Sequence, residues 1–471
     1  MQEIEQNNEQ TGSFGANSWF VEEIYNSYRD NPEDLPEQWK AYFGNMLNST
    51  NGKGTQPANG IGQTGKPVKY PQPLPGDDVR PLTGAAGKII DNMDSSLTVP
   101  TATSQRTVPV KLLEENRLLA NAHLAKLGKK KISFTHIIGW AILQAIKKYP
   151  VMNYSFSVRE GKPFVSKRST INLGIAIDVE RKDGTRNLMV PNIKNAEQLN
   201  FKQYLEHYEA LVSQSRKGSI DPSAFAGTTI SLTNPGTIGT IGSIPRLMVG
   251  QGAIIATGAI QYPAEYQAMS QSTISKLGIS KVLTLTSTYD HRIIQGAESG
   301  MFLKEIHELL LGSNGFYEQL FKDLGVPIRP MAWETDIHPG FAEGTGNFEE
   351  ITKHGKVRQL INMYRVRGHL LASIDPLRPN TSYHPELDPS HYQLTLWDLD
   401  RPYLTHDFGN KKTDSLRNIL AILQKTYCDH IGVEYMHIQN PEEKEWLQNQ
   451  MEPFQNTAHF DDETKKRLLY K

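Results

Sequence analysis

Apolar side chains recur every three to four residues in several parts of this sequence, which is the spacing of one face of an α-helix. The pattern predicts helices in IIDNMDSSL, KLLEENRLLANAHLAKL and ISFTHIIGWAILQAIKKYP, the last ending at Pro150. Runs rich in β-branched residues predict strands in INLGIAIDVE, NLMVPNI, TTISLTN, AIIATGAI and KVLTLTSTYD. Helices and strands mixed between Ala86 and Leu311 indicate one α/β domain.

The stretch GTTISLTNPGTIGTIGSIP lies within this domain and is rich in Thr, Ser and Gly. This composition predicts strands joined by tight turns, and it disfavours a helix.

Aromatic residues at helical spacing predict two short amphipathic helices near the start of the sequence, separated at Asn31-Pro32. Two such helices bury little by themselves, so we expect them to dock against a larger body in this assembly or on a partner. The aromatic positions are Trp19, Phe20, Tyr25, Tyr28, Trp39, Tyr42 and Phe43.

The composition changes twice along the chain. Residues 48–85 interleave Gly with Pro, which predicts a linker that cannot recover its ordering entropy by burial. After Gly312 the periodicity is helical in FYEQLFKDL, in the segment from Glu349 to Ile374 and in three later segments, which predicts a mainly α region. We therefore expect four parts: 1–47, 48–85, 86–312 and 313–471.

Charge and cysteine usage narrow the possible functions. The 471 residues carry 50 Lys and Arg against 51 Asp and Glu, a net charge of −1, so no global attraction to nucleic acid or an anionic membrane is expected. The first ten residues, MQEIEQNNEQ, do not resemble a signal peptide, and no apolar run approaches the ~18 residues that span a bilayer. The single cysteine, Cys428, fits a buried structural role in a reducing, cytoplasmic protein.

The segment STYDHRIIQGAESG carries the most informative chemistry, because a strand there runs into a turn bearing Asp290, His291 and Arg292. A histidine at such a position can act as a general base, since its ordinary pKa of about 6.5 leaves it neutral at pH 7. A lone histidine is nevertheless more often a hydrogen-bonded core residue.

DHRIIQG resembles the DHRxxDG signature of the acyltransferase component of 2-oxoacid dehydrogenase complexes. Further motifs of that family follow in order in GKIIDNMDSSLTVPTATSQRTVPV, LMVPNIKNAEQLNFKQY, GTTISLTNPGTIGT and AIIATGAI. The resemblance implies a coenzyme A-dependent acyltransferase fold, like that of chloramphenicol acetyltransferase, with a mixed sheet.

The resemblance also implies roles for individual residues. His291 would take the proton from the coenzyme A thiol, and the thiolate would attack the thioester of succinyl-dihydrolipoamide. Thr233 would donate to the oxyanion that forms. Asp290, Arg292 and Asn234 would support the site. Gln295 stands where the signature has a second Asp, which leaves the role of that carboxylate in doubt.

The flanking parts resemble the thiamine-dependent component of 2-oxoglutarate dehydrogenase, in SWFVEEIYNSYRDNPEDLPEQWKAYF and again from Phe316 onward. An acyltransferase domain between such pieces is similar to fused bacterial enzymes of 2-oxoglutarate metabolism, which act in the tricarboxylic acid cycle. The motifs that bind thiamine diphosphate and Mg²⁺ do not occur in the sequence, and neither does a lipoyl hairpin. We therefore expect the front portion of a longer oxidoreductase, with lipoamide supplied in trans.

The same resemblance implies partners and an assembly. The partners would be the lipoyl domain of another acyltransferase component and dihydrolipoyl dehydrogenase. The chain would form homotrimers in which His291 of one copy faces Thr233 of its neighbour. Two alternatives stay open: a catalytically silent scaffold that trimerises the dehydrogenase, favoured by Gln295, and an incomplete fragment.

Three weaker signals point to structure more than to function. The cluster of His384, Glu386, Asp388 and His391 does not have the spacing of a known metal site. GTIGTIG lacks the strand, helix and acidic residue of a dinucleotide-binding site. Lys126 and Lys129 to Lys131 predict a solvated turn, with coenzyme A phosphate as the functional alternative.

Overall fold

The computed structural model of the chain describes residues 21, 24–25, 27–29, 31, 35–49, 72–79, 81, 85–180, 186–336, 346–375, 382–406, 408–457 and 460–470. The chain divides into two compact units, each built from segments far apart in the sequence. Unit 1 comprises Met1–Arg106, Ile138–Ala259 and Thr284–Ile306, and unit 2 comprises Thr107–Ile137, Ile260–Leu283 and His307–Lys471.

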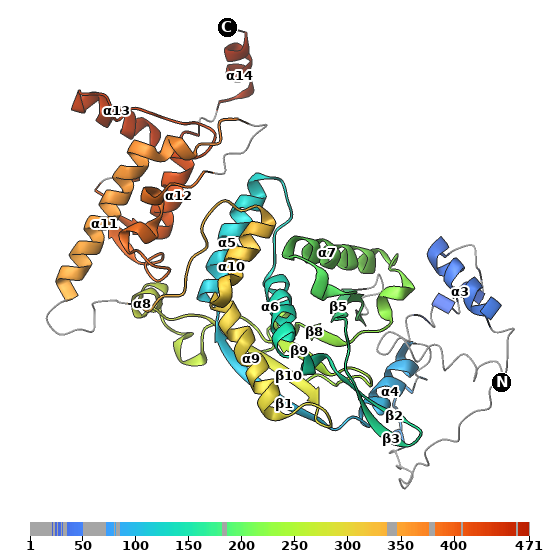
Figure 1. Ribbon diagram of the computed structural model, residues 1–471. Helices are drawn as coiled ribbons and strands as arrows, with labels where there is room; N and C mark the ends of the chain where they lie inside the picture. The colour runs from blue at the N-terminus through green and yellow to red at the C-terminus, as the bar shows by residue number, and fades with distance from the viewer. Residues whose placement is uncertain are drawn as a thin grey trace. The chain divides into compact units, whose positions relative to one another are not determined.

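The described helices and strands are interspersed up to α9, and helices dominate after it (Figure 1). The helices are α3 (Glu37–Ser49), α4 (Ala85–Ser96), α5 (Lys111–Lys126), α6 (Phe134–Lys148), α7 (Phe201–Lys217), α8 (Gln271–Leu277), α9 (Gly296–Leu310), α10 (Phe316–Leu324), α11 (Gly346–Arg367), α12 (Leu416–Tyr427), α13 (Pro441–Met451) and α14 (Asp462–Leu469). The strands are β1 (Thr101–Pro109), β2 (Ser155–Arg159), β3 (Lys162–Ser166), β4 (Leu173–Ile175), β5 (Ile177–Glu180), β6 (Arg186–Met189), β7 (Asn192–Ile193), β8 (Ile230–Thr233), β9 (Ala253–Thr257), β10 (Val282–Asp290), β11 (Pro402–Leu404) and β12 (Thr413–Ser415).

Unit 1 is organised around a six-stranded sheet in the order β1-β10-β9-β8-β4-β7. Strands β4, β8 and β9 run parallel, whereas β10 is antiparallel to β9 and β7 is antiparallel to β4. The mixed α/β sheet expected from the sequence is therefore confirmed. The expected helices and strands of this region are present within a few residues of their predicted positions, apart from the strands expected after Thr233.

Helices α6 and α9 cover one face of this sheet. A Cβ built on Gly139 in α6 would lie 3.3 Å from the Leu232 side chain of β8 and 2.2 Å from the Tyr204 hydroxyl of α7, so only glycine allows this approach. On the same face, the Ser299 hydroxyl of α9 donates to Ser287 of β10 at 3.1 Å, and both residues are buried.

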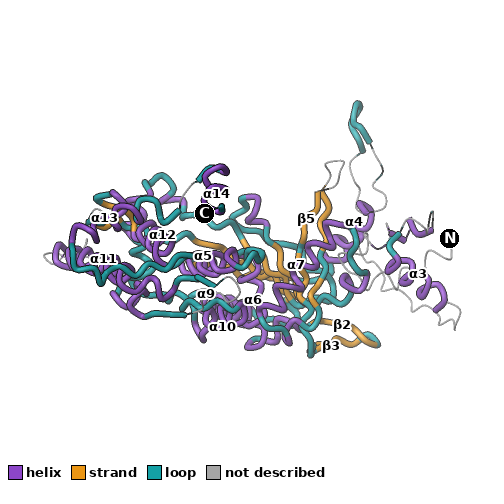
Figure 2. The backbone as a smooth tube through the Cα atoms, turned by 90° about the horizontal axis from the view of Figure 1, so that it is seen from above, coloured by secondary structure: helices purple, strands orange, loops and turns teal. Residues whose placement is uncertain are grey.

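Three local features of unit 1 differ from the sequence prediction. The segment after Thr233 forms a 3₁₀ turn at Pro235–Ile238 and an irregular loop, so the further strands predicted there are wrong. A hairpin of β2 and β3 was not predicted, although Glu160 and Gly161 join its strands with the two positive φ values of a tight hairpin turn. In the view of Figure 2 this hairpin projects from the sheet.

Helix α7 was also not predicted, although its sequence carries the signals that start and stop a helix. Asn200 and Gln203 form a reciprocal capping box at its beginning, and Gly218 takes the left-handed conformation at its end.

The aromatic segment near the start of the chain packs within unit 1, as expected of a docking element. Trp39 of α3 is fully buried, and its indole Nε1 donates to the carbonyl of Ile220 at 3.0 Å. Phe43 is buried beside it, with ring centroids 5.5 Å apart. Trp19 and Phe20 lie outside the described residues, and so does most of the predicted linker.

Unit 2 is mainly helical from α10 onward, with the short β11–β12 hairpin as an exception. Helix α12 begins at Ser415, whose hydroxyl accepts from the backbone N–H of Asn418. Its apolar residues Leu416, Ile419 and Leu423 follow the helical repeat and are fully buried, and each contributes about 1.5–3 kcal/mol by leaving water.

Candidate functional site

The turn after β10 in unit 1 presents the three charged residues that the sequence singled out. Asp290 ends the strand and is buried, whereas His291 and Arg292 lie in the turn. The backbone N–H of His291 donates to the carbonyl of Pro100 at 2.9 Å, and that of Asp290 donates to Gly252 at 3.0 Å. The backbone where the turn begins is thus fixed.

The imidazole of His291 is oriented by one hydrogen bond. Its Nδ1 lies 3.0 Å from the carbonyl oxygen of Ile294. A carbonyl oxygen can only accept, so Nδ1 carries the proton and Nε2 of the neutral ring holds a lone pair. The Tyr289 ring packs edge-on against the imidazole at 5.6 Å. Because the residue is exposed, Nε2 can accept a proton from a ligand.

Asp290 and Arg292 form a closed pair beside the histidine. The guanidinium of Arg292 donates from Nε to Oδ1 at 2.9 Å and from Nη2 to Oδ2 at 2.7 Å. It also lies over the Phe156 ring of β2, 3.8 Å from the ring centroid. The carboxylate of Asp290 is therefore occupied with Arg292 and shapes the turn.

Gln295 is the residue immediately before α9. Its backbone N–H donates to the carboxylate of Glu298 at 2.7 Å, and its side chain is exposed. A carboxylate at this point is favoured because the first turn of a helix carries unpaired N–H groups and a partial positive charge. Glu298 thus supplies a negative charge next to Gln295, the position at which the DHRxxDG signature has an Asp.

Thr233 and Asn234 stand at the other end of the sheet from the histidine. Thr233 is aligned with Ala256 of β9, and Ala256 is aligned with Thr286 of β10. His291 comes five residues after Thr286, just past the end of β10, which corresponds to about 16 Å of extended chain. Within one chain, the structure therefore does not bring Thr233 and His291 together.

Of the weaker sequence signals, Cys428 and the cluster from His384 to His391 lie in unit 2, whereas GTIGTIG, residues 236–242, lies in unit 1. Cys428 is buried, and burial raises the pKa of its thiol to about 12. Asp388 accepts from the backbone of Ser390 and from the Tyr383 hydroxyl. In the described part of the chain, no three His, Cys, Asp or Glu residues are grouped so that they could hold a metal ion.

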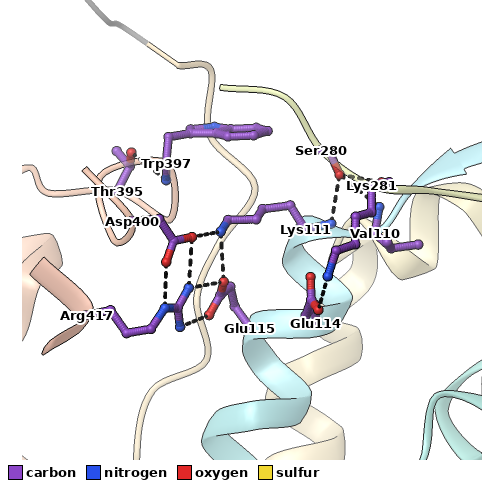
Figure 3. A network of polar contacts seen from close by, with 10 residues as sticks. All are labelled: Val110, Lys111, Glu114, Glu115, Ser280, Lys281, Thr395, Trp397, Asp400 and Arg417. Carbon is purple, nitrogen blue, oxygen red and sulfur yellow. Dashed lines mark hydrogen bonds and ion pairs between the residues drawn. The ribbon is translucent and has the colours of Figure 1, made fainter. Parts of the chain in front are cut away.

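A second polar cluster in unit 2 was missed by the sequence prediction (Figure 3). Arg417 of α12 donates to both carboxylate oxygens of Glu115 on α5, at 2.8 and 2.6 Å, and to both oxygens of Asp400, at 2.7 and 3.1 Å. The ammonium of Lys111 lies 2.6 Å from Asp400 and 2.9 Å from Glu115. No local signal could have revealed these pairs, because about 300 residues separate Glu115 from Arg417.

The charges in this cluster compensate one another. Burial opposes the ionisation of Asp400, but hydrogen bonds and positive charges from Arg417 and Lys111 lower its pKa to about 2. The cluster borders a cavity of about 280 Å³, together with Tyr262, Trp397 and Lys281. Every carboxylate oxygen of Glu115 and Asp400 accepts a charge-assisted hydrogen bond, so this side of the cavity is a closed hydrogen-bond network.

Comparison with protein families identifies the chain. The sequence profile of the 2-oxoacid dehydrogenases acyltransferase (catalytic domain) family matches residues 75–316, and the profile described as 2-oxoglutarate dehydrogenase N-terminus matches residues 13–50. The first match covers more than half of the chain, so this chain belongs to the 2-oxoacid dehydrogenase acyltransferase family.

Its curated relatives include multifunctional 2-oxoglutarate metabolism enzymes. The one from Mycolicibacterium vanbaalenii is 44% identical over 491 aligned residues, covering 93% of this chain and 39% of the relative. The one from Mycobacterium sp. strain KMS is 49% identical over 397 residues, covering 84% of this chain and 30% of the relative. The chain thus spans 30–39% of the length of these relatives.

Solved structures of acyltransferase cores are also similar. The probable dihydrolipoamide acetyltransferase of Listeria monocytogenes is 24% identical, with a TM-score of 0.43, covering 50% of this chain and 95% of that one. A catalytic core of the 2-oxoacid dehydrogenase multienzyme complex from Thermoplasma acidophilum gives 22% identity and a TM-score of 0.43, covering 50% of this chain and all of that one. Among the described residues, no helix is both long and apolar enough to cross a bilayer.

Proposed function

We propose that this chain transfers a succinyl group between dihydrolipoamide and coenzyme A, with His291 as general base and Thr233 as oxyanion donor. The observation that carries the proposal is the hydrogen bond from His291 Nδ1 to Ile294, which leaves the Nε2 lone pair available to a thiol. The succinyl group is proposed because the relatives are named for 2-oxoglutarate metabolism, and oxidative decarboxylation of 2-oxoglutarate leaves this acyl group.

The roles divide among the predicted site residues. His291 Nε2 takes the thiol proton, and the thiolate attacks the thioester carbonyl. The Thr233 hydroxyl donates to the oxyanion as charge builds there. Asp290 and Arg292 hold the turn that presents the imidazole, while Asn234 and Gln295 flank the oxyanion strand and the turn.

The active site is proposed to form between copies of the chain. A separation of about 16 Å along the sheet prevents His291 and Thr233 of one chain from acting on the same carbonyl. Apolar side chains that follow Thr233 are more than half exposed, which favours contact with another copy. They are Ile238, Ile241, Ile244 and Val249. We propose a trimer, in which every interface pairs one His291 with one Thr233.

The wider assignments extend the same proposal. The lipoyl domain of another acyltransferase component would supply the acyl group in the cytoplasm, and dihydrolipoyl dehydrogenase would reoxidise the lipoyl arm. Residues 313–471 would be the start of the thiamine-dependent component. The described residues there group no set of metal ligands, so no step through thiamine diphosphate or Mg²⁺ is assigned to this chain.

Mixed trimers test the proposal. Chains with His291→Ala and chains with Thr233→Ala are each expected to be inactive, and mixing them should restore part of the transfer from succinyl-coenzyme A to dihydrolipoamide. The matched control mixes His291→Ala with the double variant His291→Ala/Thr233→Ala, which offers no intact base and should stay inactive. Verified mixed trimers without recovery would contradict a shared site.

Calorimetry separates this function from a silent scaffold. A chain that transfers acyl groups to coenzyme A must bind coenzyme A, whereas a domain that only trimerises its partner has no need to bind it. Absence of measurable coenzyme A binding to the full chain would favour the scaffold.

A further inference from the structure

Strand β10 carries a row of hydroxyls on the face of the sheet that α6 and α9 do not cover. Side chains alternate along a strand, so Thr284, Thr286 and Thr288 share one face. Leu285 and Ser287 occupy the other face, and the contact of Ser287 with α9 identifies it as the helix-covered side. The three threonines therefore point away from the helices.

Thr286 lies in the same row of the sheet as Thr233. The register pairs Thr233 with Ala256 and Ala256 with Thr286, and side chains of paired residues point to the same face. The two threonines are separated by two strand spacings, about 9.6 Å. Between them Ala256 contributes only a methyl group.

The loop that follows Thr233 runs over this face. A Cβ built on Gly258, just after β9, would lie 1.8 Å from the carbonyl oxygen of Ile241, and one built on Gly236 would lie 2.2 Å from that of Gly258. The segment from Gly236 to Ile241 thus forms a wall next to the row of Thr233, Ala256 and Thr286.

The Thr286 hydroxyl is buried and has no hydrogen-bond partner among the described residues. Its neighbour on the same face, Thr288, is satisfied by the Thr103 hydroxyl of β1 at 3.1 Å. An unpaired buried hydroxyl lowers stability, so its presence beside the proposed oxyanion donor indicates a partner that binds from outside.

We propose that Thr286 is a specificity-determining residue that donates to the far carboxylate of a four-carbon dicarboxylic acyl group whose thioester carbonyl lies at Thr233. In an extended succinyl group the outermost oxygens are about 5–6 Å apart. A hydrogen bond of about 2.8 Å at each end gives a span of about 11 Å, which exceeds the two strand spacings by about 1.5 Å and suits a slightly bent acyl group. Thr284 offers a second hydroxyl on the same face. This inference rests on the proposed function.

Two isosteric variants test the role of Thr286. Thr286→Val removes the hydroxyl and keeps the shape, and it should lower kcat/KM for succinyl-coenzyme A with free dihydrolipoamide by about tenfold to a hundredfold. Transfer from acetyl-coenzyme A should change by less than threefold, because acetyl has no carboxylate to lose. Thr286→Ser should restore succinyl transfer.

Thr257→Val is the matched control. Thr257 of β9 is also buried, and its hydroxyl has no partner in the part of the chain that the structure describes, but its register partner Leu285 places it on the helix-covered face. Its substitution should leave both acyl transfers unchanged, and neither valine variant should lower the melting temperature, since neither removes an internal hydrogen bond.

The outcomes separate this inference from the proposed function. A wild-type chain that transfers neither acyl group would contradict both the proposed function and the role of Thr286. A wild-type chain that transfers succinyl, with Thr286→Val losing succinyl and acetyl transfer equally or losing neither, would overturn only the role of Thr286. Thr257→Val losing succinyl transfer to the same extent would also overturn it.

Discussion

The histidine turn of unit 1 and the ion-pair cluster of unit 2 use polar residues in opposite ways. Nδ1 of His291 is hydrogen-bonded to the carbonyl of Ile294, whereas Nε2 is available to a ligand on an exposed turn. In the cluster, every oxygen of Glu115 and Asp400 is bound by Arg417 or Lys111. Unused hydrogen-bonding capacity indicates a place for a ligand, whereas a saturated network indicates a structural joint.

Removal of the base should give the largest effect in this comparison. His291→Ala is expected to lower acyl transfer by about 10²- to 10⁴-fold, because the thiol proton then has no positioned acceptor. Steady-state kinetics with succinyl-coenzyme A and dihydrolipoamide measure it. His207→Ala is the matched control, since His207 of α7 is also exposed and its Nδ1 also lies against a carbonyl, that of Gln203, at 2.8 Å. A His291→Ala chain with an unchanged rate would contradict the role of the base.

Removal of the central cation should affect stability and leave the chemistry intact. Arg417→Leu leaves Glu115, whose side chain is 4% exposed, with Lys111 as its only charged partner among the described residues. We expect a loss of about 3 kcal/mol in the free energy of unfolding, at the low end of the range for buried pairs because Arg417 is itself 36% exposed. Urea titration measures this loss, and acyl transfer at a temperature where the variant is folded should match the wild type.

An exposed ion pair provides the control for that variant. Lys425 of α12 pairs with Asp429, two residues past the end of the helix, and their side chains are 49% and 20% exposed. Lys425→Ala should cost about 0.5 kcal/mol or less. If Arg417→Leu instead abolished acyl transfer while folded, the cluster would belong to the functional machinery and the comparison would fail.

The two regions also differ in how well the sequence predicted them. The histidine turn was found because Asp290, His291 and Arg292 are adjacent in the chain and lie in a recognisable motif. Helices such as α6 and α12 were also predicted, because their apolar repeat lies within one short stretch of sequence. Roles for the site residues remain predictions that the substitutions above test.

Long-range polar pairing could not be predicted from one sequence. Glu115 and Arg417 each look like an ordinary surface residue of an amphipathic helix, and only the folded chain brings them to 2.6 Å. The loop after Thr233 was misjudged for another reason, because β-branched residues with glycine also suit a loop that must approach Gly258 closely. The alternation in LTLTSTYD was visible, but which face the threonines occupy depends on where α9 packs.

Helix α3, which docks through Trp39, offers a smaller test of whether a buried, fully bonded polar group acts on stability. The indole of Trp39 donates a buried hydrogen bond to Ile220, so Trp39 should behave like the saturated cluster. Trp39→Phe leaves that carbonyl unpaired, and we expect the docking of α3 to weaken by about 1–3 kcal/mol. Hydrogen exchange of the α3 amides measures it. Lys40→Ala, which breaks an exposed pair with Glu37, should change protection little. Equal protection in Trp39→Phe would show that apolar packing alone holds the segment.

Acid titration should give the smallest effect. The pKa of Asp400 is about 2 in the folded chain against an ordinary value of 3.8, so its ion pairs stabilise the fold above about pH 4, and this contribution is lost as the pH falls from 4 to 2. Asp400→Asn should therefore be less stable than the wild type at pH 7 and approach it at pH 2. In Arg417→Leu the remaining carboxylate loses its main donor, so its titration should shift to higher pH. Unfolding free energies measured across this range check both points, and a wild-type curve parallel to that of Asp400→Asn would contradict the ion pairing of this carboxylate.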